Sequence, residues 1–174
     1  MSLPILDVLI FATIVATVYG LAINSNLYST VTDDLSCSFN YESCQYSNLD
    51  MTFGSYYVAC DSESEPLDCS LLSPIFNTSN DLCLNFGYVL NNFFHPVSLT
   101  VRLVSINGNT SVILFHDSTR GEGPRVHKII KANITIRAVQ EKSRLIFNCH
   151  RWPGTYQELD AVALYNFVAS NGQC

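Results

Sequence analysis

The feature that most constrains this chain is the alternation of apolar and polar residues along several short segments. Every second residue is apolar in residues 82–90, and the same period recurs in residues 97–103, 134–137 and 145–149. Successive side chains of a β-strand point to opposite faces, so this period predicts strands with one buried face. No segment shows an apolar stripe at helical spacing. The pattern predicts an all-β fold, built as an antiparallel sandwich or barrel.

Turns and loops separate these strands. Asn107-Gly108 lies between two apolar runs and predicts a hairpin with a type I′ turn, because both central residues of that turn need positive φ. The polar segments 61–68, 117–125 and 150–158 carry turn residues. We expect loops there, and loops are where a sandwich usually carries its binding contacts.

The N-terminal segment predicts export from the cytosol. Residues 8–18 form an apolar run too short for a comfortable membrane span, and small Gly20 follows as a cleavage position. We therefore expect a signal peptide over residues 1–20. An uncleaved anchor is the alternative, because the segment contains Asp7 and neither Lys nor Arg.

The rest of the chain is predicted to be one secreted, extracellular domain. Residues 21–35 are expected to form a short lead-in and residues 36–174 the domain, since no repeat or Pro/Gly-rich linker divides them. After cleavage no segment is apolar for long enough to span a membrane. Hydrophobic residues make up 48% and charged residues 14%, which is enough for a packed core. The net charge of −6 argues against nucleic acid and anionic membranes as partners.

All seven cysteines follow the predicted signal peptide, at positions 37, 44, 60, 69, 83, 149 and 174. In an oxidising compartment most of them should form disulfides, and the odd number leaves at least one free or intermolecular. Zinc binding is the rival interpretation, but no Cys-x-x-Cys pair is present. Three N-glycosylation triplets begin at Asn77, Asn109 and Asn133. Asn109 falls in the expected hairpin turn, Asn133 is expected to face outward on a strand, and Asn77 is expected in a loop.

Six segments in order resemble the MAM domain, an extracellular module of meprin, a neuronal surface antigen and a receptor tyrosine phosphatase. They are CSFNYESC at 37–44, LLSP at 71–74, LCLNFGY at 82–88, LTVRL at 99–103, and LDAVAL with GQC at 159–164 and 172–174. The resemblance covers residues 36–174. Cys60, Cys69 and Cys149 are additional to the family pattern.

The resemblance implies a jelly-roll-like sandwich of two antiparallel sheets, linked by disulfides. It also implies the pairs Cys37–Cys44 and Cys83–Cys174. The remaining local pair is then Cys60–Cys69, which leaves Cys149 unpaired or intermolecular, although a bond from Cys149 to either of these two stays open. Some family members are thought to hold a cation, so Asp160 and Glu158 are weak calcium candidates, with ordinary solvated carboxylates as the favoured interpretation. No other cofactor is implied.

Catalysis is not expected. Cys149-His150 could suggest a nucleophile and its base, but neighbours on a strand point to opposite faces, and Cys149 is in phase with the core. We therefore expect a buried, inert thiol. The only tryptophan, Trp152, follows Arg151 and precedes Tyr156 in an expected loop. These three residues either pack over the end of a sheet or contact a partner.

The sequence therefore predicts a non-catalytic extracellular interaction module. The first hypothesis is protein–protein recognition or adhesion, with another protein or a second copy of this chain as the partner. The alternative is a lectin-like module that binds glycans, because jelly rolls also serve as lectins. In that case Trp152, Tyr156 and Asp117 would contact the sugar.

Overall fold

A computed structural model describes the greater part of the chain that follows the predicted signal peptide. The described residues are 30–40, 42–49, 51–54, 57–59, 68–91, 96–108, 110–119, 128–151 and 161–174. The predicted signal peptide, Asn109, Trp152, Tyr156, Glu158 and Asp160 lie outside them. Within this part of the chain, no helix has the length and apolar character of a membrane-spanning segment.

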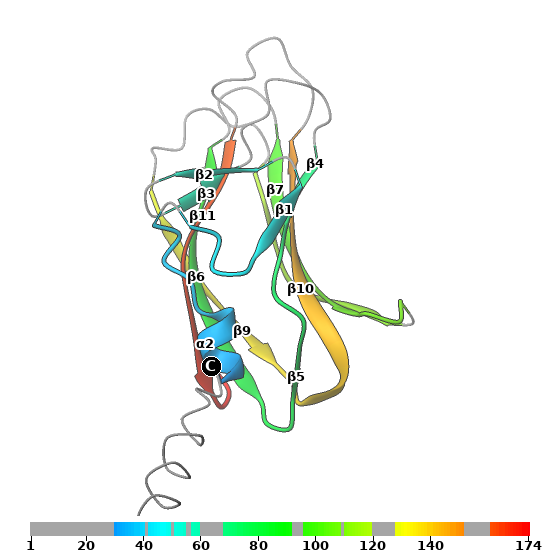
Figure 1. Cartoon of the computed structure of the whole chain (residues 1–174). Helices are drawn as coiled ribbons and strands as arrows, with labels where there is room; N and C mark the ends of the chain where they lie inside the picture. The colour runs from blue at the N-terminus through cyan, green and yellow to red at the C-terminus, as the bar shows by residue number, and fades with distance from the viewer. Residues whose placement is uncertain are drawn as a thin grey trace, which may run out of the picture.

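The described residues form a jelly-roll-like sandwich of two antiparallel sheets, which confirms the predicted fold class (Figure 1). The six-stranded sheet has the order β1-β4-β10-β7-β8, with β5 pairing β10. Its strands are β1 (Ser47–Leu49), β4 (Asp68–Leu72), β5 (Phe76–Thr78), β7 (Val97–Ser105), β8 (Ser111–Ser118) and β10 (Val139–Arg151). The five-stranded sheet has the order β2-β3-β11-β6-β9. Its strands are β2 (Thr52–Gly54), β3 (Tyr57–Ala59), β6 (Leu82–Asn91), β9 (Ile130–Ile136) and β11 (Ala161–Asn171).

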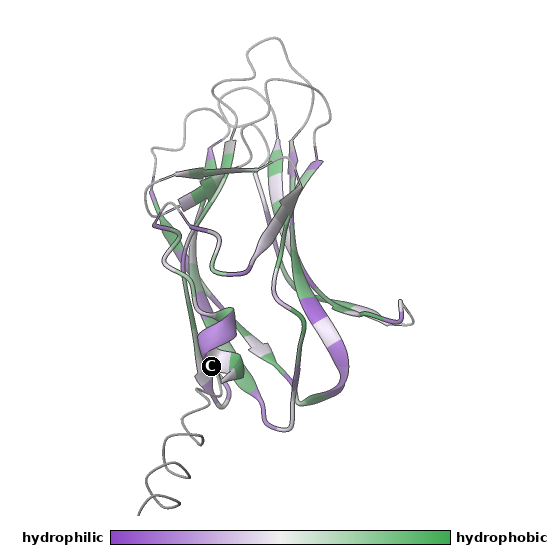
Figure 2. Ribbon diagram, in the orientation of Figure 1, coloured by the Kyte–Doolittle hydropathy of each residue, from purple (hydrophilic) through white to green (hydrophobic). Residues whose placement is uncertain are grey.

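The core lies between the sheets and is built from the alternating segments. Hydrophilic and hydrophobic residues follow one another along the long strands (Figure 2). Most inward residues of β6, β7, β9 and β10 are buried, and the innermost include Leu84, Leu99, Ile136, Leu145 and Phe147. The two-residue period thus determines which face of each sheet is removed from water.

A β-bulge in β11 brings an additional aromatic ring into this core. Between Tyr165 and Val168 the register with β6 shifts, and Asn166 adopts a left-handed φ of 42°. Asn tolerates this conformation better than most residues. The extra residue turns Phe167 inward, where its ring stacks on Phe147 with centroids 4.7 Å apart and meets Phe39 edge-on at 4.8 Å. Beyond the bulge, β11 continues to Asn171.

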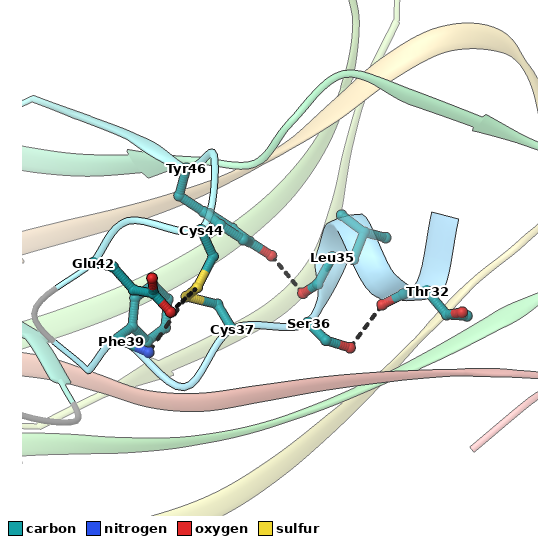
Figure 3. Close-up of a disulfide and its surroundings, with 8 residues drawn as sticks. All are labelled: Thr32, Leu35, Ser36, Cys37, Phe39, Glu42, Cys44 and Tyr46. Carbon is teal, nitrogen blue, oxygen red and sulfur yellow. Dashed lines mark hydrogen bonds between the residues drawn. A yellow bond between two sulfur atoms is a disulfide. The ribbon is translucent and has the colours of Figure 1, made fainter. Parts of the chain in front are cut away.

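The N-terminal described segment is attached to this bulge. Helix α2 (Val31–Leu35) begins with a capping box between Thr30 and Asp33, and its Leu35 is fully buried. Tyr46 points its hydroxyl at the carbonyl oxygen of Leu35, 2.8 Å away, beside the Cys37–Cys44 disulfide (Figure 3). Backbone hydrogen bonds join Cys37 to Phe167 in both directions. Part of the segment expected to be a lead-in therefore contributes to the core.

The hairpin between β7 and β8 forms where the sequence predicts it, but with a different turn. Gly108 donates its N–H to the carbonyl oxygen of Ser105 at 2.9 Å, and Ser105 donates to the carbonyl oxygen of Thr110 at 3.0 Å. Gly108 has a φ of 74°, whereas Asn107 does not have a positive φ. A type I′ turn requires positive φ at both positions, so the expectation of that turn type was wrong. The hydrogen-bonded residues Ser105 and Thr110 instead enclose a loop longer than two residues.

The C-terminus is held against β6 and β9. Cys83 of β6 forms a disulfide with Cys174, the pairing that the family resemblance implies, and the Cys174 N–H donates to Thr135 Oγ1 at 3.2 Å. Next to this link, the Asp81 carboxylate accepts hydrogen bonds from the Ala138 N–H and the Gln173 side-chain amide, each at 2.8 Å. A single carboxylate thus ties the end of β9 to the C-terminal tail.

The Asp81 contacts predict a specific acid sensitivity. The hydrogen bond from Ala138, then that from Gln173, lowers the pKa of Asp81 below its usual 3.8, and Arg137 adds a smaller effect. The unfolded chain therefore takes up this proton first as the pH falls, so the stabilisation is present above about pH 4 and is lost below it. We expect the urea midpoint of the wild type to fall more steeply between about pH 5 and pH 3 than that of Asp81→Asn. Parallel pH profiles for the two proteins would contradict this role.

Candidate functional site

The buried cysteine is not a reactive centre. Cys149 is a free thiol with no exposed surface, and burial raises its pKa to about 12. His150 points to the opposite face of the sheet, where its Nδ1 lies 2.5 Å from Asp68 Oδ1. A thiol that stays protonated, with its neighbouring imidazole on the other side of the strand, cannot act as a nucleophile and base pair.

Cys149 also has a cysteine directly opposite. It pairs in register with Cys69 of β4, and both side chains are buried. Cys69 is itself disulfide-bonded, and Cys60, the partner predicted for it, lies outside the described residues. No cluster of three or more His, Cys, Asp or Glu side chains that could hold a metal ion occurs among the described residues. The calcium candidates Asp160 and Glu158 lie outside that part of the chain.

The outer face of the six-stranded sheet carries polar side chains that bond to one another across the strands. Asn148 donates to Ser70 Oγ at 2.7 Å, and Thr100 Oγ1 lies 2.9 Å from His116 Nδ1. Together with the His150–Asp68 contact, these pairs join β10 to β4 and β7 to β8 across this face. The rings among these paired side chains are the imidazoles of His116 and His150, and no tyrosine ring accompanies them among the described residues.

The outer face of the five-stranded sheet is different, because one row of residues carries two tyrosines between two glycines. In-register pairs place one residue of each strand in this row, in the order Gly54, Tyr57, Tyr165, Gly87, Lys131. Neighbouring strands lie about 4.8 Å apart, so the row is a continuous line across the sheet. We call its two rings, Tyr57 and Tyr165, the tyrosine platform.

The platform is formed because the glycines leave room for the rings. A Cβ placed on Gly54 would lie 2.3 Å from Cζ of Tyr57, so this ring lies directly over the glycine. One side of the ring therefore faces the backbone of β2, and Tyr57 is 37% exposed on the other side. The Tyr165 ring is half-buried, with its centroid 5.9 Å from that of Tyr57 and its plane inclined by 44°. The two rings thus form a shallow, angled surface.

Chemically, the platform combines ring faces with hydrogen-bond donors. Burial, and to a smaller extent the neighbouring phenol of Tyr57, raises the pKa of Tyr165, so its hydroxyl stays protonated and can donate. Lys131 and Asn85 are exposed on the same face. Next to the rings, Ile129 is 49% exposed and its side chain lies over Gly87, while Val168 is 46% exposed. This is an apolar patch with a polar margin, as expected of a binding surface.

The sequence did not identify this platform. Of the residues predicted to contact a partner, Arg151 ends β10, whereas Trp152 and Tyr156 lie outside the described residues. Asp117, predicted as a sugar contact, instead accepts a hydrogen bond from Tyr88 at 2.6 Å. Asn133 is exposed, as expected for a glycosylated asparagine, and Asn77 is also exposed but lies in β5 rather than in a loop.

Comparisons with known proteins identify the fold. No model of a known protein family and no curated protein matches the sequence. Among solved structures, the CBM22-1 xylan-binding domain of Xyn10C from Paenibacillus barcinonensis is similar, with 14% identity, a TM-score of 0.53, and coverage of 80% of this chain and 94% of that one.

Two further solved structures show the same architecture. The K1 cleaved adhesin domain of Lys-gingipain from Porphyromonas gingivalis has 11% identity, a TM-score of 0.54, and coverage of 79% of this chain and 98% of that one. The CBM22-1–GH10 modules of Clostridium thermocellum xylanase 10B, complexed with xylohexaose, have 8% identity and a TM-score of 0.52. That match covers 80% of this chain and 28% of the other. At these identities the likeness shows a shared β-sandwich fold and does not by itself assign a function.

Proposed function

We propose that this protein is an extracellular, non-catalytic module that binds carbohydrate on the tyrosine platform. The observation that carries the proposal is the pair of tyrosine rings lying side by side on a sheet face, one of them directly over a glycine. A pyranose ring presents C–H groups on its faces and hydroxyl groups around its edge. Aromatic rings can pack against the C–H groups, and the Tyr165 hydroxyl, Lys131 and Asn85 can form hydrogen bonds to the hydroxyl groups.

Other observations support this proposal over the hypothesis of protein recognition. The structurally similar proteins include a xylan-binding domain and modules complexed with xylohexaose. Disulfides are typical of extracellular proteins. Among the described residues, polar side chains on the opposite sheet bond to each other in pairs, and no pair of tyrosine rings like the platform lies on that sheet.

The test is a titration of the secreted protein with soluble oligosaccharides, beginning with xylohexaose. Tyr57→Ala and Tyr165→Ala should each weaken binding by about tenfold or more, which corresponds to losing about 1.4 kcal/mol of ring contact. Gly54→Ala should weaken binding although both tyrosines remain, because its Cβ displaces the Tyr57 ring. Ile113→Ser, on the other sheet, should have no effect and serves as the control.

Two outcomes would contradict the proposal. One is sugar binding that is unchanged in the Tyr57→Ala/Tyr165→Ala double variant, with circular dichroism confirming that the variant is folded. The other is the absence of binding to any sugar by wild-type protein from which N-linked glycans have been trimmed.

Protein recognition stays the second candidate, because a different surface supports it. Ile106, Val112 and Ile113 are all exposed on the β7–β8 hairpin, and β8 is an edge strand. An exposed apolar edge strand favours contact with another protein. Self-association that Ile113→Ser abolishes and sugars do not affect would favour this second candidate.

We also propose that the chain is a divergent relative of the MAM domain. The disulfides Cys37–Cys44 and Cys83–Cys174 support this, because they join the cysteines that the resemblance pairs. The division into a signal peptide, a lead-in and one domain stays a prediction. N-terminal sequencing of secreted protein would test the cleavage site.

A further inference from the structure

One N-glycosylation triplet lies on the same sheet face as the tyrosine platform. Asn133 belongs to β9, between the inward residues Ala132 and Ile134, and its side chain is exposed on the outer face. Its neighbour two residues earlier, Lys131, is the end of the platform row. Asn133 and the platform are therefore parts of one surface, although Tyr165 and Tyr57 lie 32 and 76 positions from Asn133 in the sequence.

The separation between Asn133 and the platform is short. Asn133 pairs with Asn85 of β6, and Asn85 pairs with Val168 of β11. Adjacent strands lie about 4.8 Å apart, so two strand spacings, roughly 10 Å, separate Asn133 from the strand that carries Tyr165. An oligosaccharide attached to Asn133 extends across this distance within its first few sugar units.

The surface between these points favours contact with a sugar chain. Gly87 has no side chain, and the Cγ2 methyl group of Ile129 lies in its place beside Tyr165. Ile129 and Val168 leave about half of their surfaces exposed. Covering such an apolar strip removes it from water, while the exposed Asn85 and Lys131 can bond to sugar hydroxyl groups.

We propose that an N-linked glycan on Asn133 lies across this face, covers the Tyr165 side of the platform and limits its access to external sugars. In the secretory pathway the oligosaccharide comes from a lipid-pyrophosphate donor. The Asn133 amide nitrogen forms a bond to the anomeric carbon and loses a proton, while the bond from that carbon to the donor phosphate oxygen breaks. The part of this proposal that concerns access to external sugars rests on the proposed carbohydrate-binding function.

A second triplet provides a matched control. Asn77 is also exposed, but it lies in β5, which pairs with β10 in the other sheet. A glycan there starts on the opposite side of the sandwich from the platform. Replacing Asn133 is preferable to replacing Thr135, because Thr135 Oγ1 accepts the hydrogen bond from the Cys174 N–H.

The experiment measures the accessibility of the tyrosines directly, without an added ligand. Secreted wild-type, Asn133→Gln and Asn77→Gln proteins are iodinated under mild conditions, and modification of Tyr165 and Tyr57 is quantified by peptide mass spectrometry. The same is done on folded wild-type protein after an endoglycosidase has trimmed its glycans, in case Asn133→Gln folds poorly. We expect Tyr165 modification to rise severalfold in Asn133→Gln and after trimming, and to stay at the wild-type rate in Asn77→Gln.

The outcomes separate this inference from the proposed function. An unoccupied Asn133 in the secreted protein, or equal Tyr165 modification in all forms, would overturn the inference while leaving platform binding to be judged by titration. Glycan-dependent protection of Tyr165 in a protein whose trimmed form binds no sugar would support coverage by the glycan and contradict the proposed function. Protection together with tighter binding of xylohexaose after trimming would support both.

Discussion

Removing the Cys83–Cys174 disulfide is expected to lower the free energy of unfolding by about 4–5 kcal/mol, because the bond closes a long loop in the unfolded chain. The two cysteines are 91 positions apart, and the chain between them includes β6 to β11. Loss of this amount is a large part of the total stability of an ordinary domain. The double variant Cys83→Ser/Cys174→Ser should therefore show a strongly reduced urea midpoint and a low secreted yield.

The short disulfide provides the comparison. Cys37 and Cys44 are only 7 positions apart, so the double variant Cys37→Ser/Cys44→Ser should lose about 2–3 kcal/mol. Both variants replace a pair of cysteines, and neither leaves a new free thiol. Equal losses in the two variants would show that loop length does not govern the effect.

Phe167→Ala is expected to cost about 3–5 kcal/mol, the range for removing a buried aromatic ring. The ring is fully buried and contacts four other rings, those of Phe39, Tyr46, Phe86 and Phe147. Two of these rings lie in the N-terminal segment and two lie in opposite sheets. Truncation would leave a cavity where the sheets and the N-terminal segment meet.

The neighbouring residue is the matched control for Phe167. Val168 follows it in β11 but is 46% exposed on the outer face, so Val168→Ala should change the stability by no more than about 0.5 kcal/mol. Both substitutions remove apolar atoms from the same strand, and only one removes them from the core. Similar losses of stability in equilibrium denaturation would contradict the bulge geometry that turns Phe167 inward.

The long strands could be predicted from the sequence because each has enough residues to show its period. In β10 the inward residues Leu145, Phe147 and Cys149 are buried and alternate with half-buried outward ones, whereas in β6 most outward residues are buried as well. The same phase correctly placed Cys149 in the core and Asn133 on the outer face. These assignments need only the local sequence, because successive side chains of a strand point to opposite faces.

The shorter elements could not be predicted in this way. Strands β1, β2 and β3 have three residues each, which is too few for a period to be recognised. The bulge at Asn166 exchanges the inward and outward positions in the rest of β11. Nothing in the local pattern of Tyr165, Asn166 and Phe167 indicates this change. Its cause is tertiary, because turning Phe167 inward completes the cluster of rings.

The candidate site could not be predicted from the sequence for a related reason. Tyr57 and Tyr165 are more than one hundred positions apart, and only the register of β3 against β11 brings them together. The signal that could have suggested them is the pair Gly54 and Tyr57, since a glycine in a short strand often marks a close approach by another group. An alternating pattern cannot show which outward residues become neighbours across strands.

The most direct test of carbohydrate binding on the tyrosine platform is to locate the bound sugar. Isotope-labelled, glycan-trimmed protein would be titrated with the tightest-binding oligosaccharide, and the changes in amide chemical shift would be mapped by NMR. Our account predicts that the largest changes lie at and beside Tyr57, Tyr165 and Gly87 in the five-stranded sheet. Changes confined to the polar face of the six-stranded sheet, or to the β7–β8 hairpin, would contradict it.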